Sequence, residues 1–308
     1  MRNFVAMACL LAVVILAAPT AGWSYGQPSV NLGFTSFVDG GPPAGPGVYF
    51  QQYFQYYTTD EFKDLAFPPG MEPELDVTVS LTQLLYQSNQ EVLMGGKWGI
   101  NAMLPIVDFD LDNAPPGMET NGGVGDLLIG PYLQWDPIMG ANGPIFMHRI
   151  ELQMIFPTGD YDEDAAINAG SNHFSFNPYW SATAFLTPQW TASWRLHYLW
   201  NDKNEDPGGG ADDFQAGQAV HANFTTDYEV IPKQLRVGIN GYWFKQVSDS
   251  EVNGDEVDGE REEVFAIGPG LVWHINQNQH LFLNGYKETT AEYRTEGERV
   301  TLRYVHHF

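Results

Sequence analysis

The nine residues Val300–Phe308, VTLRYVHHF, decide the fold class of this chain. Apolar or aromatic side chains stand at every second position except His306, which is the period of a β-strand with one apolar face. The apolar face consists of Val300, Leu302, Tyr304 and Phe308, and the polar face includes Thr301, Arg303 and His307. An edge strand of a soluble β-protein can show the same alternation, so the rest of the chain must decide which environment this face meets.

The opposite end of the chain has the features of an export signal over residues 1–24. A positive charge at Arg2 precedes an apolar run from Phe4 to Ala18, and small residues follow. This run is too short for a membrane-spanning helix, and no later stretch reaches the roughly 18 apolar residues that such a helix needs. The single cysteine, Cys9, lies inside the signal. Export without disulfides favours an envelope β-barrel over a small disulfide-linked secreted domain.

The composition of the chain is typical of an all-β protein, with 14% aromatic residues, 32 glycines and 20 prolines. Period-two alternation between Gly, Pro, Asn and Asp boundaries predicts strands near 48–57, 75–86, 92–106, 125–135, 145–156, 174–186, 190–200, 214–228, 235–246, 264–275, 280–290 and 299–308. About twelve strands in one domain, residues 48–308, predict an up-and-down antiparallel transmembrane β-barrel of outer-membrane type.

The expected connections alternate between long and short. Long ones fall at 58–74, 107–124, 157–173, 201–213, 247–263 and 291–298, and short ones at 87–91, 136–144, 187–189, 229–234 and 276–279. A barrel with long loops on one rim, short turns on the other and both termini on the short-turn side gives this alternation. We therefore expect a location in the bacterial outer membrane, with lipid around the wall and both termini in the periplasm.

Charge follows the same division. The six long connections hold 29 of the 38 Asp and Glu residues but only four of the 14 Lys and Arg residues. The formal net charge of −24 is therefore a property of one rim, and the wall is nearly neutral. A lipid-facing wall requires this, because Lys or Arg at the bilayer midplane costs about 2–4 kcal/mol. Such an acidic chain is not expected to bind nucleic acid.

Within each strand, the apolar face is assigned to lipid and the polar face to the lumen. Trp190, Trp194 and Leu196 then point outward, for example, with Thr191 and Ser193 inward. The same rule gives the candidate residues of a solute path in the lumen, which are Arg149, Glu151, Arg195, His197, His221, Arg236, Asn240 and Arg303. Such arginines could bind the carboxylate or phenolate of a solute, or they could form cross-strand ion pairs that fill a narrow barrel.

Neither a metal, a cofactor nor an enzymatic activity is expected from the motifs. The run Asp160–Asp164 begins like a calcium loop but lacks the glycine and the later glutamate of that loop. Ser193 and His197 could serve in a barrel enzyme that acts on lipid, but pairing across strands cannot be read from one sequence.

Residues 25–47 are rich in glycine and proline and precede the first expected strand. Two interpretations are open. The stretch could be a flexible periplasmic N-terminal segment, or it could fold into the lumen as a small plug, since Phe34 and Phe37 give it apolar content.

Three stretches resemble the outer-membrane family described after the meta-pathway of phenol degradation. They are GGPPAGPGVY at 40–49 leading into YFQYY at 53–57, GDLLIGPY at 125–132 and PTGDY at 157–161. The resemblance covers most of the chain after the export signal. It implies a transporter barrel for small, largely apolar molecules such as aromatic compounds or lipid-like amphiphiles, and it supplies no catalytic residue and no defined substrate.

The strand at 300–308 likewise resembles the closing strands of outer-membrane barrels. This resemblance implies that Val300, Leu302, Tyr304 and Phe308 form an insertion signal, with the barrel-assembly machinery as the partner.

These observations together predict a channel for small hydrophobic or aromatic solutes. A twelve-stranded barrel is narrower than a sixteen-stranded porin, so bulk diffusion of hydrophilic solutes should be restricted. The first alternative is a structural or adhesive barrel with a sealed lumen, in which the acidic loops carry the function. The second is an outer-membrane enzyme that acts on lipid.

Overall fold

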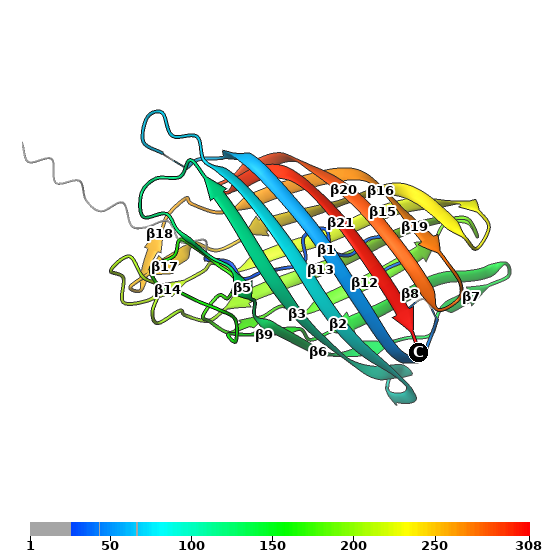
Figure 1. Ribbon diagram of the computed structural model, residues 1–308. Helices are drawn as coiled ribbons and strands as arrows, with labels where there is room; N and C mark the ends of the chain where they lie inside the picture. The colour runs from blue at the N-terminus through cyan, green and yellow to red at the C-terminus, as the bar shows by residue number, and fades with distance from the viewer. Residues whose placement is uncertain (1–25, 43, 66) are drawn as a thin grey trace, which may run out of the picture.

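The computed structural model describes residues 26–308 except residues 43 and 66, so the expected export signal at 1–24 lies outside the described residues. The described chain forms a closed barrel of twelve antiparallel wall strands and contains no helix (Figure 1), which confirms the predicted fold class. No helix in this part of the chain has the length and apolar character needed to cross a membrane.

The wall strands in chain order are β1 (Gly47–Phe62), β2 (Glu74–Leu93), β3 (Gly96–Asp112), β6 (Leu127–Gln134), β8 (Gly143–Glu151) continued by β9 (Met154–Phe156), β11 (Ser175–Phe176) continued by β12 (Tyr179–Phe185), β13 (Trp190–Asn201), β15 (Ala219–Ile231), β16 (Leu235–Gln246), β19 (Glu263–His274), β20 (Gln279–Glu292) and β21 (Thr295–His307). Each pairs with its neighbours, and β1 closes the barrel against β21 from Tyr49↔His307 to Phe62↔Thr295.

Short strands lie in the connections. They are β4 (Thr120–Asn121), β5 (Gly123–Val124), β7 (Ile138–Gly140), β10 (Ile167–Asn168), β14 (Phe214–Gln215), β17 (Ser250–Val252) and β18 (Asp255–Val257). β10 pairs with β4, and β14 with β17, so the long connections fold against one another at one end of the barrel. We call this end the long-loop end and the opposite end the short-turn end.

Two predicted connections were wrong. The long connection expected at 291–298 is a turn of two residues, Tyr293 and Arg294, with Tyr293 in the left-handed region at φ 51°. The turn expected at 87–91 lies instead at Met94 and Gly95, because β2 continues to Leu93. A membrane needs only about 9–11 residues per strand. The 20 residues of β2 and the 14 of β20 extend the sheet beyond that length and take up residues that the sequence had assigned to connections.

The predicted faces of the wall strands are confirmed on β13. Trp190 and Leu196 are 47% and 46% exposed on the outer surface, whereas Thr191 and Ser193 are buried inside. On β8 and β19, Ile150 and Ile267 face outward, and Arg149 and Ala266 face inward. The apolar outer band therefore has the pattern of a lipid-facing wall.

The long-loop half of β2 reverses this pattern. Leu75 and Leu81 are buried on its inner face, and Thr78 is exposed on its outer face. In the short-turn half of β2 the usual pattern returns, because the polar Gln83 is buried inside and the apolar Leu84 is exposed outside. The neighbouring β3 follows the same rule, with Val107 inside and Asp108 outside. The long-loop half of these two strands thus has a polar outer surface and an apolar inner surface, which the sequence rule did not predict.

Residues 26–46, here called the inner segment, lie along the inside of the barrel. At the long-loop end, Gln27 Nε2 donates to the Gly217 carbonyl at 3.0 Å. Midway, the Gly33 amide donates to Asn223 Oδ1 at 2.9 Å, and at the short-turn end the Pro46 carbonyl contacts the ring of His307. Leu32 and Phe37 each belong to an apolar cluster with wall residues. The inner segment therefore spans the barrel from one end to the other.

Candidate functional site

The inner segment divides the lumen into two cavities, since its residues up to Phe34 line one of them and residues from Thr35 onward line the other. The cavity near the long-loop end has a volume of about 220 Å³ and is here called the apolar chamber. The cavity near the short-turn end has a volume of about 1000 Å³ and is here called the arginine chamber. Arg195 borders both cavities.

The apolar chamber lies behind the reversed half of β2 and β3. The wall side chains that line it include Leu75, Val77, Val79, Leu81, Met103, Pro105, Val107, Phe109 and Leu128. Residues 167–171, from the connection between β9 and β11, also contribute to its lining. A cavity of this size with a largely aliphatic lining fits one small apolar ring better than a hydrated sugar.

Arg294, in the turn between β20 and β21, also lines the apolar chamber and pairs with Glu262 at 3.5 Å. Glu262 lies in the connection before β19, outside the wall strands. Burial raises the pKa of Glu262 to about 7, and the nearby Arg294 only partly opposes this shift. Glu262 is thus linked to the apolar chamber through Arg294, which lines it.

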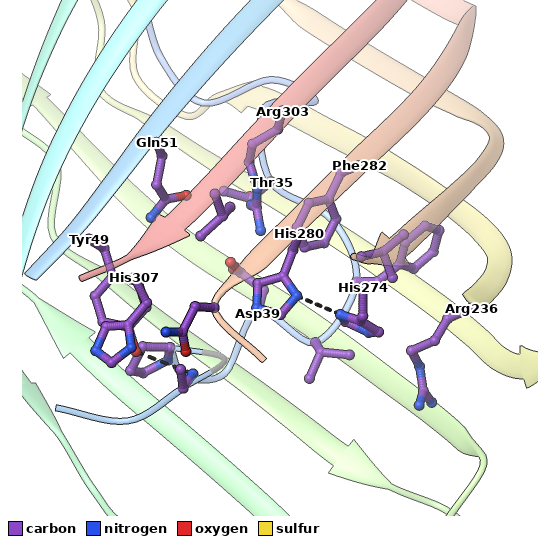
Figure 2. Close-up of a pocket in the computed structure, with 18 of the residues that line it drawn as sticks. Thr35, Asp39, Tyr49, Gln51, Arg236, His274, His280, Phe282, Arg303 and His307 are labelled. Carbon is purple, nitrogen blue, oxygen red and sulfur yellow. Dashed lines mark hydrogen bonds between the residues drawn. The ribbon is translucent and has the colours of Figure 1, made fainter. Parts of the chain in front are cut away.

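The arginine chamber collects polar side chains from strands that are far apart in sequence. Figure 2 shows Arg303 on β21, with Phe282 and His280 on β20, projecting into this cavity. His280 Nδ1 and His274 Nδ1 lie 2.7 Å apart next to the turn between β19 and β20. Arg149, Arg195 and Arg236 complete the set of arginines in the lining.

The structure places all eight candidate residues inside the barrel, but it does not bring all of them to one site. Four of them, the arginines Arg149, Arg195, Arg236 and Arg303, line the arginine chamber. The other four, Glu151, His197, His221 and Asn240, are buried in the wall packing and line neither chamber. Their part in a solute path stays a prediction.

Two of the four arginines have carboxylate partners. Arg195 forms a bidentate pair with Asp39 of the inner segment, at 2.7 and 2.8 Å, and lies over the ring of Tyr179. Arg236 on β16 pairs with Asp227 on the neighbouring β15. The Arg236–Asp227 pair is a cross-strand ion pair of the kind that one sequence interpretation allowed, whereas the Arg195–Asp39 pair joins the wall to the inner segment.

Arg149 and Arg303 are different, because neither forms an ion pair with a carboxylate in the described part of the chain. Neither Arg149 nor Glu151, which lie on the same strand β8, forms the cross-strand ion pair that the sequence interpretation allowed. Instead Glu151 accepts hydrogen bonds from Tyr179 and from Asn101. The guanidinium groups of Arg149 and Arg303 lie over the rings of Tyr132 and Phe282, at 4.1 and 3.8 Å.

The candidate enzyme residues do not form a catalytic pair. Ser193 faces the interior rather than lipid, and its hydroxyl lies 2.9 Å from that of Thr183. His197 stacks on His221, with ring centroids 4.0 Å apart, and both rings contact Asn177 Oδ1. Within the described chain this arrangement gives Ser193 no histidine to act as its base.

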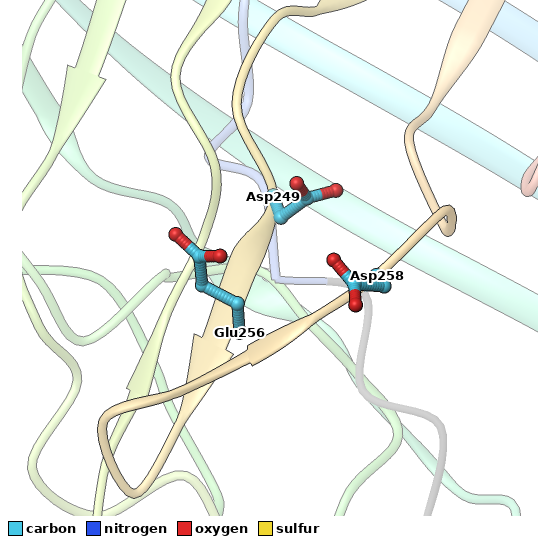
Figure 3. A group of neighbouring side chains, drawn as sticks. All are labelled: Asp249, Glu256 and Asp258. Carbon is cyan, nitrogen blue, oxygen red and sulfur yellow. The ribbon is translucent and has the colours of Figure 1, made fainter.

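Three acidic side chains near β17 and β18 come together in the long-loop region. Carboxylate oxygens of Asp249, Glu256 and Asp258 lie within 4.8 Å of one another (Figure 3). Arg261 already binds Asp249 through two hydrogen bonds, and Glu256 and Asp258 are exposed to solvent. We assign no metal site to this group.

The residues expected to form the insertion signal lie on the outer surface. Val300, Leu302 and Phe308 are exposed, Tyr304 is partly exposed on the same face, and the Phe308 amide donates to the Val48 carbonyl at 3.0 Å. This position allows contact with lipid. Recognition by the assembly machinery stays a prediction.

Sequence reasoning missed three charged residues of the lumen, Asp39, Glu288 and Arg299. Glu288 accepts hydrogen bonds from Tyr57 and Tyr242, and Arg299 lies 3.9 Å from it. Glu288 and Arg299 could have been found by extending the alternation along their strands. Glu288 lies an even number of positions from Phe282, and Arg299 from Arg303, so each shares the inward face of that residue. Asp39 had no such signal, since it precedes the strands.

A closed, apolar-walled barrel with cavities inside it has the architecture of an outer-membrane channel. The chain belongs to the family described as "Putative MetA-pathway of phenol degradation", whose model matches residues 52–304. Among solved structures it is similar to the COG4313 outer membrane channel from Pseudomonas putida F1, with 19% identity, a TM-score of 0.74, and coverage of 91% of this chain and 100% of that chain.

Two further solved barrels are less similar. The beta domain of the Bordetella autotransporter BrkA has 13% identity and a TM-score of 0.47, over 85% of this chain and 100% of that one. The CymD monoaromatic hydrocarbon channel has 8% identity and a TM-score of 0.40, over 86% and 91%. Comparison with curated proteins gives no match. The similarity to the COG4313 channel identifies the fold as that of an outer-membrane barrel.

Proposed function

We propose that this protein is an outer-membrane channel for small apolar or aromatic molecules. The observation that carries the proposal is the reversed half of β2 and β3, where the inner face is apolar and the outer face is polar. Contact with lipid explains apolar side chains on the outer face of a strand but not on its inner face. A solute that prefers an apolar lining does explain them. The family's description, a pathway of phenol degradation, supports an aromatic solute.

In this proposal the barrel spans the outer membrane with its acidic long loops outside and both termini on the periplasmic side. Outer-membrane lipid surrounds the apolar band, and the barrel-assembly machinery inserts the chain through the strand β21. Solute enters at the long-loop end, passes the apolar chamber and the contact between Asp39 and Arg195, and leaves through the arginine chamber. The protein performs no chemistry on the solute.

The test is solute uptake by vesicles that contain the refolded protein. Catechol and glucose are compared, because both are neutral and hydroxylated but only one is aromatic. We expect catechol uptake several-fold above that of protein-free vesicles, with little glucose uptake. Val79→Asn, which places an amide in the apolar chamber, should reduce catechol uptake several-fold. The control Thr78→Asn changes the adjacent outward residue and should leave uptake unchanged.

A second candidate is a structural or adhesive barrel with a sealed lumen. It is favoured by one observation, the length of the inner segment and its hydrogen bonds to the wall from Gln27 to Gly40. Absence of catechol uptake by a correctly folded barrel would reject the channel and support this candidate. Equal uptake of catechol and glucose would reject the apolar selectivity.

A further inference from the structure

The arginine chamber carries a charge opposite to that of the whole protein. Its lining contains five basic residues, Arg149, Arg195, Lys233, Arg236 and Arg303, and one carboxylate, Asp39. The complete chain has only 14 Lys and Arg residues and a net charge of −24. More than a third of all basic residues thus surround one cavity of about 1000 Å³. This concentration points to an anionic occupant.

Ion pairs within the protein account for only part of this positive charge. Asp39 neutralises Arg195, and Asp227, behind the lining, neutralises Arg236. Arg149 and Arg303 are 6% and 9% exposed and have no carboxylate partner in the described part of the chain. A buried cation without a counter-charge is unfavourable. The buried carboxylate of Glu151 acts electrostatically on Arg149 and supplies part of its counter-charge. Arg303 has no such carboxylate among the described residues, which indicates that its counter-charge comes from a ligand in the cavity.

The packing of Arg303 leaves its Nε–H without a partner, although Tyr53 interacts with another part of the guanidinium. Its guanidinium lies face-on over the Phe282 ring at 3.8 Å, with the Tyr53 ring at 5.8 Å. Stacking uses the face of the guanidinium, whereas its N–H donors point outward in the plane. The buried Arg303 Nε has no hydrogen-bond partner, and a buried donor without a partner is costly. A carboxylate matches this free edge with two parallel hydrogen bonds.

The rest of the cavity wall favours an apolar body attached to that anion. Phe37, Leu85 and Val305 lie in the lining and belong to one apolar cluster with Phe282. We propose, on the basis of the channel function proposed above, that the arginine chamber binds aromatic carboxylates. Arg303 holds the carboxylate, Arg149 supplies a second positive charge, and the ring contacts the apolar cluster. The substrates of the proposed channel therefore include aromatic acids in addition to neutral aromatic compounds.

Equilibrium dialysis of the full chain in lipid nanodiscs tests this binding without requiring transport. Radiolabelled benzoate is the probe, acetate is the probe without a ring, and empty nanodiscs correct for partition into lipid. We expect saturable benzoate binding that Arg303→Gln weakens at least tenfold. The control Lys287→Gln removes a positive charge from an exposed outer side chain and should leave binding unchanged. Acetate should bind at least tenfold more weakly than benzoate.

Unchanged benzoate binding in Arg303→Gln would overturn the proposal, and so would equal binding of acetate and benzoate, which would reveal a general anion field only. If Arg303→Gln fails the heat-dependent gel-shift test for a folded barrel, Arg303→Lys replaces it, because lysine keeps the charge but lacks the planar fork. Weaker benzoate binding is again expected. Benzoate binding without catechol uptake would reject the channel alone, whereas catechol uptake without benzoate binding would reject the aromatic-acid site alone.

Discussion

Asp39 and Arg195 join the inner segment to the barrel wall through two parallel hydrogen bonds of 2.7 and 2.8 Å. Both side chains are about one-tenth exposed, so water screens this ion pair only weakly. Arg195 borders both chambers, and its guanidinium also lies over Tyr179. Arg195 therefore lies where the two chambers meet, and its ion-pair partner Asp39 belongs to the inner segment.

Replacing Asp39 should open a passage between the two chambers. Asp39→Asn leaves Arg195 buried without its counter-charge, and loss of one partner of such a pair costs about 3–5 kcal/mol. We expect the inner segment to leave the wall and single-channel conductance in planar bilayers to rise severalfold. Asp136→Asn, which breaks the exposed pair with Lys97, is the control and should not change conductance. Equal conductance in both variants would show that the ion pair does not hold the segment in place.

Gly40 offers an independent way to displace the inner segment. A Cβ atom at this position would lie 2.4 Å from the Met147 carbonyl oxygen and 2.5 Å from the Thr183 amide nitrogen, both of them backbone atoms that cannot move aside. Gly40→Ala should therefore push the segment off the wall and raise conductance, although Asp39 and Arg195 are retained. Gly285→Ala is the matched control, because a Cβ there meets no atom within 4 Å. A closed channel in Gly40→Ala would mean that the segment shifts without leaving the lumen.

The strands were predictable from sequence because the polarity of each strand face matches the medium that the face contacts. Trp190 and Leu196 meet an apolar medium and Thr191 meets the interior, so alternation alone gives their directions. The reversal at Leu75 and Thr78 was not predictable by the same rule. That rule assumes lipid along the whole strand, and nothing in one sequence marks where lipid ends.

The site was less predictable than the fold. The inward direction of Arg195 follows from alternation, but its partner Asp39 lies 156 residues away in a stretch without periodicity. That Arg236 has a carboxylate partner and Arg303 has none could be decided only from the pairing between strands. In fact Arg236 meets Asp227 across a strand pair, while Arg303 meets only aromatic rings. The set of arginines in the lumen could therefore be predicted from alternation. Which of them form ion pairs with carboxylates could not be predicted.

The connection that ends at Glu262 should lose stability as the pH rises. Burial raises the pKa of Glu262 to about 7 in the folded protein, so the protonated form is favoured there. Its stabilising contribution is fully present below the ordinary carboxyl pKa and is lost as the pH rises through about 7. The shift corresponds to a change on the order of 3 kcal/mol at most.

Amide hydrogen exchange of residues 247–262, corrected for intrinsic rates, measures this effect. We expect stronger protection at pH 5 than at pH 8 in the unmodified protein. Glu262→Gln, which resembles the protonated form, should be protected equally at both values. A variant that keeps the full pH dependence would assign the titration to another group.

Arg236 and Asp227 should stabilise the barrel only as a pair. Asp227 is 2% exposed and accepts hydrogen bonds from Arg236 and from Thr191, while Arg236 also donates to the Gln189 carbonyl at 2.8 Å. Arg236→Met leaves a buried carboxylate without its cation and should cost about 3–5 kcal/mol of unfolding free energy. The double variant Arg236→Met with Asp227→Asn removes both charges and should recover most of that loss.

Urea unfolding in lipid vesicles, followed by tryptophan fluorescence, measures the unfolding free energy of each variant. Lys287→Met breaks an exposed pair with Glu298 and should cost less than about 1 kcal/mol. Losses that simply add in the double variant would show that the two side chains stabilise the barrel independently.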